Sequence, residues 1–430
     1  MKISRRTLPR APARLLASDL RGVSRLAVDA TLGLTDLVEH LHHNIQRAPP
    51  PLGKVSQPPT RGITGLVYRS IRGATRLVGG SVDALLGRLV SLLGPATEDA
   101  VAGAAERDTV IAALNGVLGD HLVASGNPLA ITMTLRDDEC ALAPQADALA
   151  QALPQARPRL LLLVHGLCMH PRQWRRNGHD YGAALAAEGG FTPLHLHYNS
   201  GRHVSTNGRE LADLLQALQA AWPVPLQEIV VLAHSMGGLV ARSALHQAQA
   251  RGDRWPGLVT RMFFLGTPHH GAPLERGGHW IDLLLGASPY TAAFSRLGRL
   301  RSAGITDLRH GSLLDEDWSG ADRFAHGHDT RTPVPLPAGV ACYAMAGALG
   351  NGSQRVHQAL LGDGLVPVDS ALGRHPEPAR ALAFDSDRQW VGPGLGHLDL
   401  LGHADVAAQL RAWLLAPPAA VAAPEVAAAG

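Results

Sequence analysis

One stretch, residues 228–250, constrains the fold of this chain more than any other. It opens with an apolar, β-branched run that ends at Ala233, passes Ser235, and continues from Gly237 with the spacing of an apolar helix. The residues two positions before and two positions after the serine are therefore both small. A sharp strand-to-helix turn needs small residues there, because larger side chains would clash. The stretch predicts a buried strand that turns at Ser235 directly into a helix.

Strand-like and helix-like segments alternate over most of the chain. Apolar runs predict strands at 129–135, 159–165, 192–198, 228–233, 259–265, 339–346 and 379–384. Helical spacing predicts helices at 98–124, 179–188, 207–221, 237–250 and 403–415. Continuous apolar strands between helices favour a mainly parallel sheet with helices on both faces. We expect an α/β domain over 98–415.

Three segments fall outside this alternation. Residues 271–335 carry tryptophan, tyrosine and leucine among glycines and charges, which predicts an inserted helical cap. The tail, 416–430, is rich in alanine and proline and is expected to be disordered. Residues 1–97 contain two amphipathic runs, 13–46 and 61–93, separated by a proline-rich break.

The N-terminal segment 1–97 allows two interpretations. Apolar positions at helical spacing suit a helical hairpin that packs on the α/β domain. The first 100 residues also hold fourteen Lys and Arg against seven Asp and Glu, whereas the remainder holds 25 against 29. A basic amphipathic segment is suited to lie on an anionic membrane surface, so peripheral membrane contact through 1–97 stays open.

Composition argues against several classes of protein. There is neither an aromatic-interleaved basic patch nor a zinc spacing, so nucleic acid is not an expected partner. No run reaches the roughly 18 uncharged apolar residues of a spanning helix. Ser4-Arg5-Arg6-Thr7-Leu8 is similar to a twin-arginine signal, but charges interrupt the apolar core that should follow. Three scattered cysteines favour a reducing compartment, so we expect a cytoplasmic protein, with attachment to a membrane left open.

Ser235 has candidate partners for nucleophilic catalysis. A serine hydroxyl needs a base to accept its proton and an acid to orient that base. Asp363, between two glycines, is the candidate acid, with Asp369, Asp385 and Asp387 as rivals; His397, in a glycine-lined loop, is the candidate base, with His403 as its rival. The order Ser235, Asp363, His397 is the chain order of α/β-hydrolases.

An oxyanion also needs donors. Gly166 follows the strand 159–165 and lets the backbone approach a substrate, so the N–H groups of Leu167 and Met236 are the candidate donors. His165 is expected to brace its loop without transferring protons, and Gly166 and His234 are expected to support the same site.

No metal and no cofactor is expected. The histidine pairs His42-His43, His269-His270 and His326-x-His328 lack a carboxylate or cysteine complement, so we interpret them as solvated loop residues. Gly347-x-x-Gly350-x-Gly352 has the wrong spacing for a dinucleotide fingerprint.

Several strings together resemble a known family. V-H-G-L at 164–167, A-H-S-M-G-G at 233–238, G-T-P-H-H-G at 266–271, D-G-L-V-P at 363–367 and H-L-D at 397–399 are similar to bacterial α/β-hydrolase lipases and esterases, with the GPI inositol-deacylase-like group nearest. The resemblance covers roughly 160–415 and implies the roles given above to Ser235, Asp363 and His397. True lipases of this kind hold calcium with an Asp at the position of Asp399. No second calcium carboxylate is present in 338–362, so Asp399 is expected to cap the final helix.

The resulting prediction is a serine hydrolase that cleaves carboxylic esters of acyl or lipid type through an acyl-enzyme. Three alternatives stay open at this point. The same triad serves acyltransferases and thioesterases, the cap is compatible with a lipase that needs an interface, and the chain is also compatible with a non-catalytic protein that binds a membrane surface.

Overall fold

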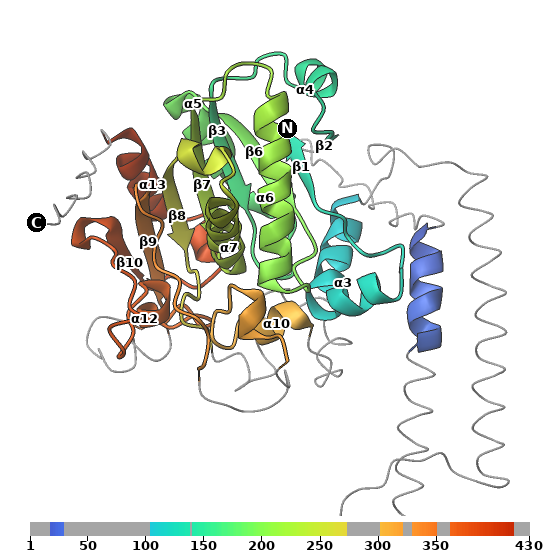
Figure 1. Ribbon diagram of the computed structural model, residues 1–430. Coiled ribbons are helices and arrows are strands. Elements are labelled where there is room, and N and C mark those ends of the chain that lie inside the picture. Colours follow the sequence, from blue (N-terminus) through green and yellow to red (C-terminus); the bar gives the residue numbers. More distant parts are fainter. Residues whose placement is uncertain are drawn as a thin grey trace, which may run out of the picture. The chain divides into compact units, whose positions relative to one another are not determined.

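The computed structural model describes residues 18–29, 104–137, 140–272, 302–320, 329–350 and 362–416. The chain divides into two compact units, Met1–Arg107 with Leu122–Ala130 and Asp108–His121 with Ile131–Gly430. In the first unit, residues 18–29 form a helix (blue in Figure 1), and Asp19 on this helix pairs with Arg107 at 2.7 Å. The second unit contains the sheet.

Eight strands of the described residues form one sheet in the spatial order β10-β9-β8-β7-β3-β6-β1-β2 (Figure 1). Strands β6, β3, β7, β8, β9 and β10 are parallel, and β1 and β2 add an antiparallel edge. Their bounds are β1 Thr134–Asp137, β2 Cys140–Leu142, β3 Arg159–Val164, β6 Thr192–His197, β7 Glu228–His234, β8 Val259–Leu265, β9 Ala341–Ala348 and β10 Gln389–Pro393. A separate hairpin pairs β4 Arg175–Arg176 with β5 His179–Asp180.

Helices lie on both faces of this sheet (Figure 1). Helices α6 and α7 contact each other along one face, and α5 and α13 contact each other on the other. The helix bounds are α3 Ala104–Ala124, α4 Ala146–Ala152, α5 Tyr181–Gly189, α6 Val204–Ala221, α7 Met236–Arg251, α10 Ala303–Asp307, α12 Val368–Ala371 and α13 Ala404–Leu415. Short 3₁₀ turns are η2 Pro171–Trp174, η3 Trp255–Leu258, η5 Asp315–Asp317, η6 Ser386–Arg388 and η7 Asp399–Leu401.

The central strands divide their side chains between two apolar cores. On β3, Leu160 and Leu162 join the core that includes the α6 and α7 side chains, while Leu161 and Leu163 join the core on the α5 and α13 side. Successive side chains of a strand point to opposite faces, so a strand buried on both faces must be apolar at every position. The mainly parallel α/β sheet predicted from these runs is confirmed, and its strand order and two covered faces are those of an α/β-hydrolase.

Two strand predictions need correction. The last strand is β10, not 379–384, where Leu382 and Phe384 lie in irregular chain and Phe384 packs against Phe264. Strand β10 lies at the sheet edge with a mostly half-exposed surface, so its sequence lacks the apolar run by which buried strands are recognised. The first strand begins at Thr134 rather than at 129, because only that part pairs with β6.

The predicted cap, 271–335, is described only in part. Its described residues include α10 and η5, whereas 273–301 and 321–328 lie outside the described residues. Most of the amphipathic runs at 13–46 and 61–93, and the tail after Ala416, also lie outside them. In the described parts of the chain, none of the helices combines the length and apolarity that crossing a bilayer requires.

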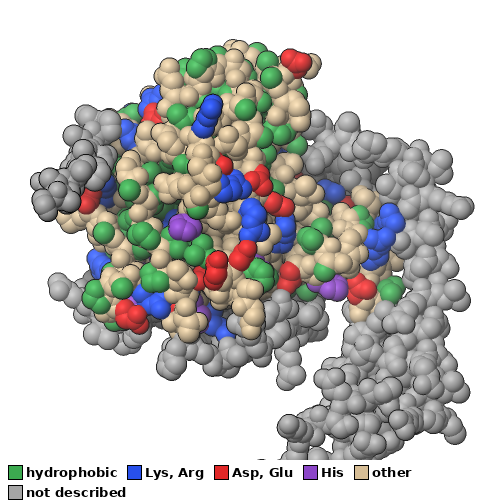
Figure 2. Space-filling view, in the orientation of Figure 1, with side chains coloured by type: hydrophobic (Ala, Val, Ile, Leu, Met, Phe, Trp, Pro, Cys, Tyr) green, Lys and Arg blue, Asp and Glu red, His purple; other side chains and the backbone are tan. Residues whose placement is uncertain are grey.

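The face drawn in Figure 2 carries acidic and basic side chains close together, with hydrophobic side chains interspersed. Exposed ion pairs occur among the described residues, for example Arg251 with Asp213 at 2.6 Å. Such exposed pairs contribute little to stability because water and salt screen them.

Candidate active site

Ser235 lies at the turn between β7 and α7, at the carboxyl edge of the sheet. Its backbone has φ 53° and ψ −128°, a conformation that side chains other than glycine seldom adopt. The N–H of Ser235 donates to the carbonyl of Leu265 at the end of β8, at 2.8 Å, which anchors the turn to the neighbouring strand. A strained serine at a strand-to-helix turn is the geometry expected of a nucleophile elbow.

Small residues permit this turn. A Cβ atom added to Gly237 would lie 2.4 Å from the carbonyl oxygen of Val164 and 2.5 Å from that of His165. A Cβ on Gly166 would lie 2.9 Å from the Cβ of Ser235. The end of β3 therefore packs directly on the serine turn, and both glycines are needed for that approach. Ala233 is fully buried in β7, where it pairs with Val164 of β3 and Phe264 of β8.

Asp363 and His397 meet, although 34 positions separate them in the sequence. Nδ1 of His397 donates to Oδ2 of Asp363 at 2.7 Å, and both side chains are almost completely buried. The other carboxylate oxygen, Oδ1, accepts from the N–H groups of Leu365 and Val366 at 3.0 and 2.8 Å. The backbone N–H of His397 also donates to the carbonyl of Asp363. These contacts fix the carboxylate and leave Nε2 of the imidazole as the free acceptor.

The rival acids and the rival base occupy different surroundings. Asp369, Asp385 and Asp387 are exposed, and Asp369 pairs with Arg374 on the surface. His403 is the N-cap residue of α13, where its Nδ1 accepts from the N–H of Asp405 at 3.2 Å. None of these four side chains contacts the imidazole of His397 through a hydrogen bond in the described structure.

Ser235 lies beside the Asp363–His397 pair without a hydrogen bond to it. A Cβ on Gly266, the residue after Leu265, would lie 3.1 Å both from Oδ2 of Asp363 and from Cε1 of His397. His234, the residue before the serine, has its Nε2 3.1 Å from the carbonyl oxygen of His397. Nε2 of His397 is buried and has no partner among the described residues. In ligand-free hydrolases the serine–histidine contact is commonly long and tightens when substrate binds.

The two candidate oxyanion donors lie on either side of Ser235. Met236 is the first residue of α7, and the first N–H groups of a helix have no acceptor within the helix. Leu167 follows β3 and is buried, and no acceptor among the described residues takes its N–H. The next residue, Cys168, has a positive φ of 60°. Its N–H donates to Oγ of Ser200 at 3.0 Å, so the loop after β3 is held in one shape.

Ser200 is a supporting residue that the sequence analysis missed. It belongs to Asn199-Ser200-Gly201, which follows β6 at the same carboxyl edge as Ser235. Polar turn residues after a parallel strand are the signal that would have found it, because ligand sites in such sheets lie at the carboxyl ends of strands.

His165 and His234 are buried and neutral. Burial lowers the pKa of His165 to about 3, and burial followed by the nearby His397 lowers the pKa of His234 well below its usual value. The ring of His165 stacks on Tyr198 with centroids 4.5 Å apart, and the Tyr198 hydroxyl donates to the carbonyl of His165. Residues with such low pKa values hold loops in place and do not gain a proton near neutral pH.

Two sequence expectations about other side chains are wrong. Asp399 does not cap α13; its carboxylate accepts from the N–H of Gly396 at 2.9 Å, within the loop that carries His397. His269 and His270 are not solvated, because His269 is fully buried and His270 is half-buried, and each accepts a hydrogen bond from an arginine. Polar residues that follow a strand are typical of a surface loop, but other segments of the fold cover the loop that carries His269 and His270.

The described residues contain no group of three histidine, cysteine or acidic side chains placed to hold a metal ion. The other two histidine pairs of the sequence analysis, at 42–43 and at 326 and 328, lie outside the described residues.

Residues 157–334 match the model of a protein family described as PGAP1-like alpha/beta domain. The resemblance of the sequence motifs to the GPI inositol-deacylase-like group is confirmed for this segment, which is less than half of the chain. The matched segment includes Ser235 and ends before Asp363 and His397.

Solved structures similar to this chain include a lipase from Bacillus licheniformis in its mature form, with 18% identity and a TM-score of 0.39, over 66% of this chain and 98% of that one. Phospholipase PlaB from Legionella pneumophila is 14% identical with a TM-score of 0.39, over 60% of each chain, so the match spans less than two thirds of the phospholipase. An esterase from Pyrococcus furiosus is 12% identical with a TM-score of 0.35, over 60% of this chain and 81% of that one. No curated protein sequence matches the chain.

Proposed function

We propose that this protein hydrolyses carboxylic esters with Ser235 as nucleophile, His397 as general base and Asp363 as the acid that orients it. The observation that carries the proposal is the buried 2.7 Å hydrogen bond between Asp363 and Nδ1 of His397, which leaves Nε2 without a partner beside a strained serine. A serine, a base and an orienting acid are the three groups that acyl transfer requires.

The reaction proceeds in two halves. Oγ of Ser235 attacks the ester carbonyl carbon while Nε2 of His397 takes the hydroxyl proton. The tetrahedral oxyanion is held by the N–H groups of Leu167 and Met236. His397 then gives its proton to the leaving alkoxide, which departs as the alcohol and leaves an acyl-serine. Water loses a proton to Nε2, attacks the acyl carbon and releases the carboxylic acid as Ser235 regains its proton.

The roles of the surrounding residues follow from their contacts. The carboxylate of Asp363 keeps the proton of neutral His397 on Nδ1, and it stabilises the imidazolium that forms during the reaction. Because two backbone N–H groups hold its other oxygen, the carboxylate cannot rotate away from the ring. Nε2 of His397 is buried and has no hydrogen-bond partner among the described side chains. To complete the triad, the Ser235 hydroxyl must move into hydrogen-bond reach of this atom.

The substrate class is an ester of a carboxylic acid, and we extend it to acyl lipids. Support for the extension comes from the resemblance of the motifs to lipases and esterases and from the match of 157–334 to the PGAP1-like alpha/beta domain. An ester panel of increasing acyl length separates the two: activity that rises with chain length supports a lipid substrate, and activity only on short esters restricts the protein to esterase chemistry.

The decisive experiment is labelling with a fluorophosphonate, followed by identification of the modified peptide. We expect one adduct, on Ser235, and loss of p-nitrophenyl ester hydrolysis in step with labelling. The Ser235→Ala variant should fold with an unchanged circular dichroism spectrum, fail to label and show no turnover above background. An adduct on another serine, or a Ser235→Ala variant that keeps most of its activity, would falsify the proposal.

A further inference from the structure

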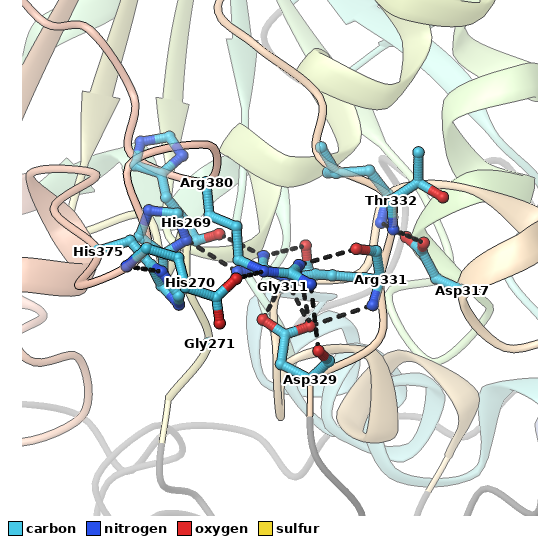
Figure 3. Close-up of polar contacts among 12 residues, drawn as sticks. His269, His270, Gly271, Gly311, Asp317, Asp329, Arg331, Thr332, His375 and Arg380 are labelled. Carbon is cyan, nitrogen blue, oxygen red and sulfur yellow. Dashed lines mark hydrogen bonds and ion pairs between the residues drawn. The ribbon is translucent and has the colours of Figure 1, made fainter.

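Arginines and histidines, some fully and some partly buried, line a small cavity of about 20 Å³ next to the loop that follows β8. Figure 3 shows the polar contacts of four of them, His269, His270, Arg331 and Arg380. The arginines and histidines of the cavity walls come from four places in the chain. Arg242 lies on α7, His269 and His270 follow β8, Arg331 lies in the segment 329–334, and Arg380 lies in the turn after α12. Three guanidinium groups thus line a space that holds a single water-sized particle.

Arg331 and Arg380 are fully engaged by protein acceptors. Arg331 bonds to the carboxylate of Asp329 through Nε, to the carbonyls of His269 and Gly311, and to Nδ1 of His270 at 2.8 Å. Arg380 bonds to Glu377 and to the backbone carbonyls of Arg331 and Asp329. Figure 3 shows both side chains converging on Asp329. Each of these two charges therefore has a carboxylate partner.

Arg242 differs from both. Its side chain is buried, and its two hydrogen bonds go to neutral acceptors, Nδ1 of His269 at 3.2 Å and the carbonyl of Val334 at 2.5 Å. Its Nε has no acceptor, and among the described residues no carboxylate forms an ion pair with it. A buried cation without a counter-ion is strongly unfavourable, because burial removes its hydration.

His269 adds a second donor without a partner. Its Nδ1 accepts from Arg242, so the neutral ring carries its proton on Nε2. Nε2 is buried and has no acceptor among the described residues. Arg242 and His269 of the cavity walls thus each carry a buried N–H group without an acceptor among the described residues, and one of these groups belongs to a cation. Buried donors normally have a partner, so an acceptor in the cavity would satisfy both.

We propose that this cavity binds one small monovalent anion of the halide class. The charge of Arg242 and the free donors of Arg242 and His269 call for an acceptor with a negative charge. Arg242 carries the one charge without a carboxylate partner, which calls for a monovalent ion, and the cavity volume of about 20 Å³ is enough for an ion of one atom. The bound ion holds α7, the loop after β8 and the segment 329–334 together. Because α7 begins directly after Ser235, the ion also stabilises the helix that follows the serine turn. This inference does not depend on the proposed hydrolysis.

Diffraction from crystals of the full chain grown in sodium bromide tests the site directly. We expect an anomalous difference peak in the cavity, within contact of Arg242 and His269. A cavity that shows only a water-like peak without anomalous signal, while bromide is seen elsewhere on the surface, overturns the proposal. Because this reads position rather than activity, it stays informative if the ester hydrolysis fails.

Thermal unfolding gives an independent measure. Sodium chloride should raise the Tm by a few degrees relative to sodium gluconate at the same ionic strength, because a ligand that binds only the folded state stabilises it. The Arg242→Met variant should lose this difference, and Arg251→Met, a change at an exposed, ion-paired arginine on the same helix, should keep it. Equal Tm values of the wild type in chloride and gluconate contradict the proposal. If Arg242→Met does not fold, the wild-type salt comparison and the bromide peak decide.

Discussion

Replacing Gly237 by alanine tests the packing that shapes the serine turn. The added methyl would lie 2.4 Å from the carbonyl oxygen of Val164 and 2.5 Å from that of His165, whereas real Cβ atoms keep at least 3.0 Å. Both neighbours are backbone atoms, so no side chain can rotate away. The end of β3 must therefore move back from the turn by about 0.6 Å or more, in a region that is packed like a crystal.

The change in unfolding free energy of Gly237→Ala is the difference between two opposed effects. Alanine in a helix is favoured over glycine by up to about 1 kcal/mol, while overpacking a core costs about 1–3 kcal/mol. We expect a net loss of about 1–2 kcal/mol, which lowers the Tm by about 2–4 °C in a chain of this size. Movement of the β3 end also displaces Leu167 and its N–H relative to Ser235, and displacements approaching 1 Å reduce turnover by roughly 10- to 100-fold.

The assay combines calorimetry with kcat/KM on a p-nitrophenyl ester, and Gly257→Ala is the matched control. Gly257 lies in η3, and a Cβ added there meets nothing within 4 Å. The control should retain the wild-type Tm and activity. If Gly237→Ala matches the control in both measurements, the close approach of β3 to the turn does not constrain this residue.

Three further predictions concern the same site and its surroundings. Asp363→Asn should lower kcat/KM by about 10⁴-fold, because the amide no longer fixes the imidazole tautomer, whereas Asp369→Asn on the surface should leave it unchanged; equal losses would assign the acid elsewhere. Asp399→Ala should lower kcat about 10-fold by freeing the Gly396 N–H and loosening the loop of His397, and Asp399→Asn, whose amide oxygen still accepts, should restore it; an equally impaired Asn variant would contradict this role. Stability should fall as the pH drops below about 6.5. Burial lowers the pKa of His165 to about 3 and of His170 to about 4, so below the ordinary histidine value only the unfolded chain gains these protons, at up to about 1.4 kcal/mol per pH unit for each. A Tm that stays constant between pH 7.5 and 5.0 at fixed salt would refute it.

Local sequence was sufficient to predict the strands that are buried on both faces of the sheet. Strands β3, β7 and β8 are apolar on both faces, so their runs were recognisable and their bounds were predicted within one residue. The edge strand β10 has one exposed side, and the apolar run at 379–384 packs on other segments without joining the sheet. Strand prediction from composition fails at such edges because pairing, not apolarity, makes them strands.

The sequence by itself determined the α/β class, the serine turn with its small flanking residues, and the short set of acids and histidines from which a base and its partner had to come. Only the tertiary structure decided that Asp363 and no rival carboxylate contacts His397, that Asp399 holds the loop of His397, and that His269 and Arg242 are buried together. The physical reason is distance along the chain. A turn or a strand depends on neighbouring residues, whereas a hydrogen bond between distant side chains depends on how the sheet brings its strand ends together.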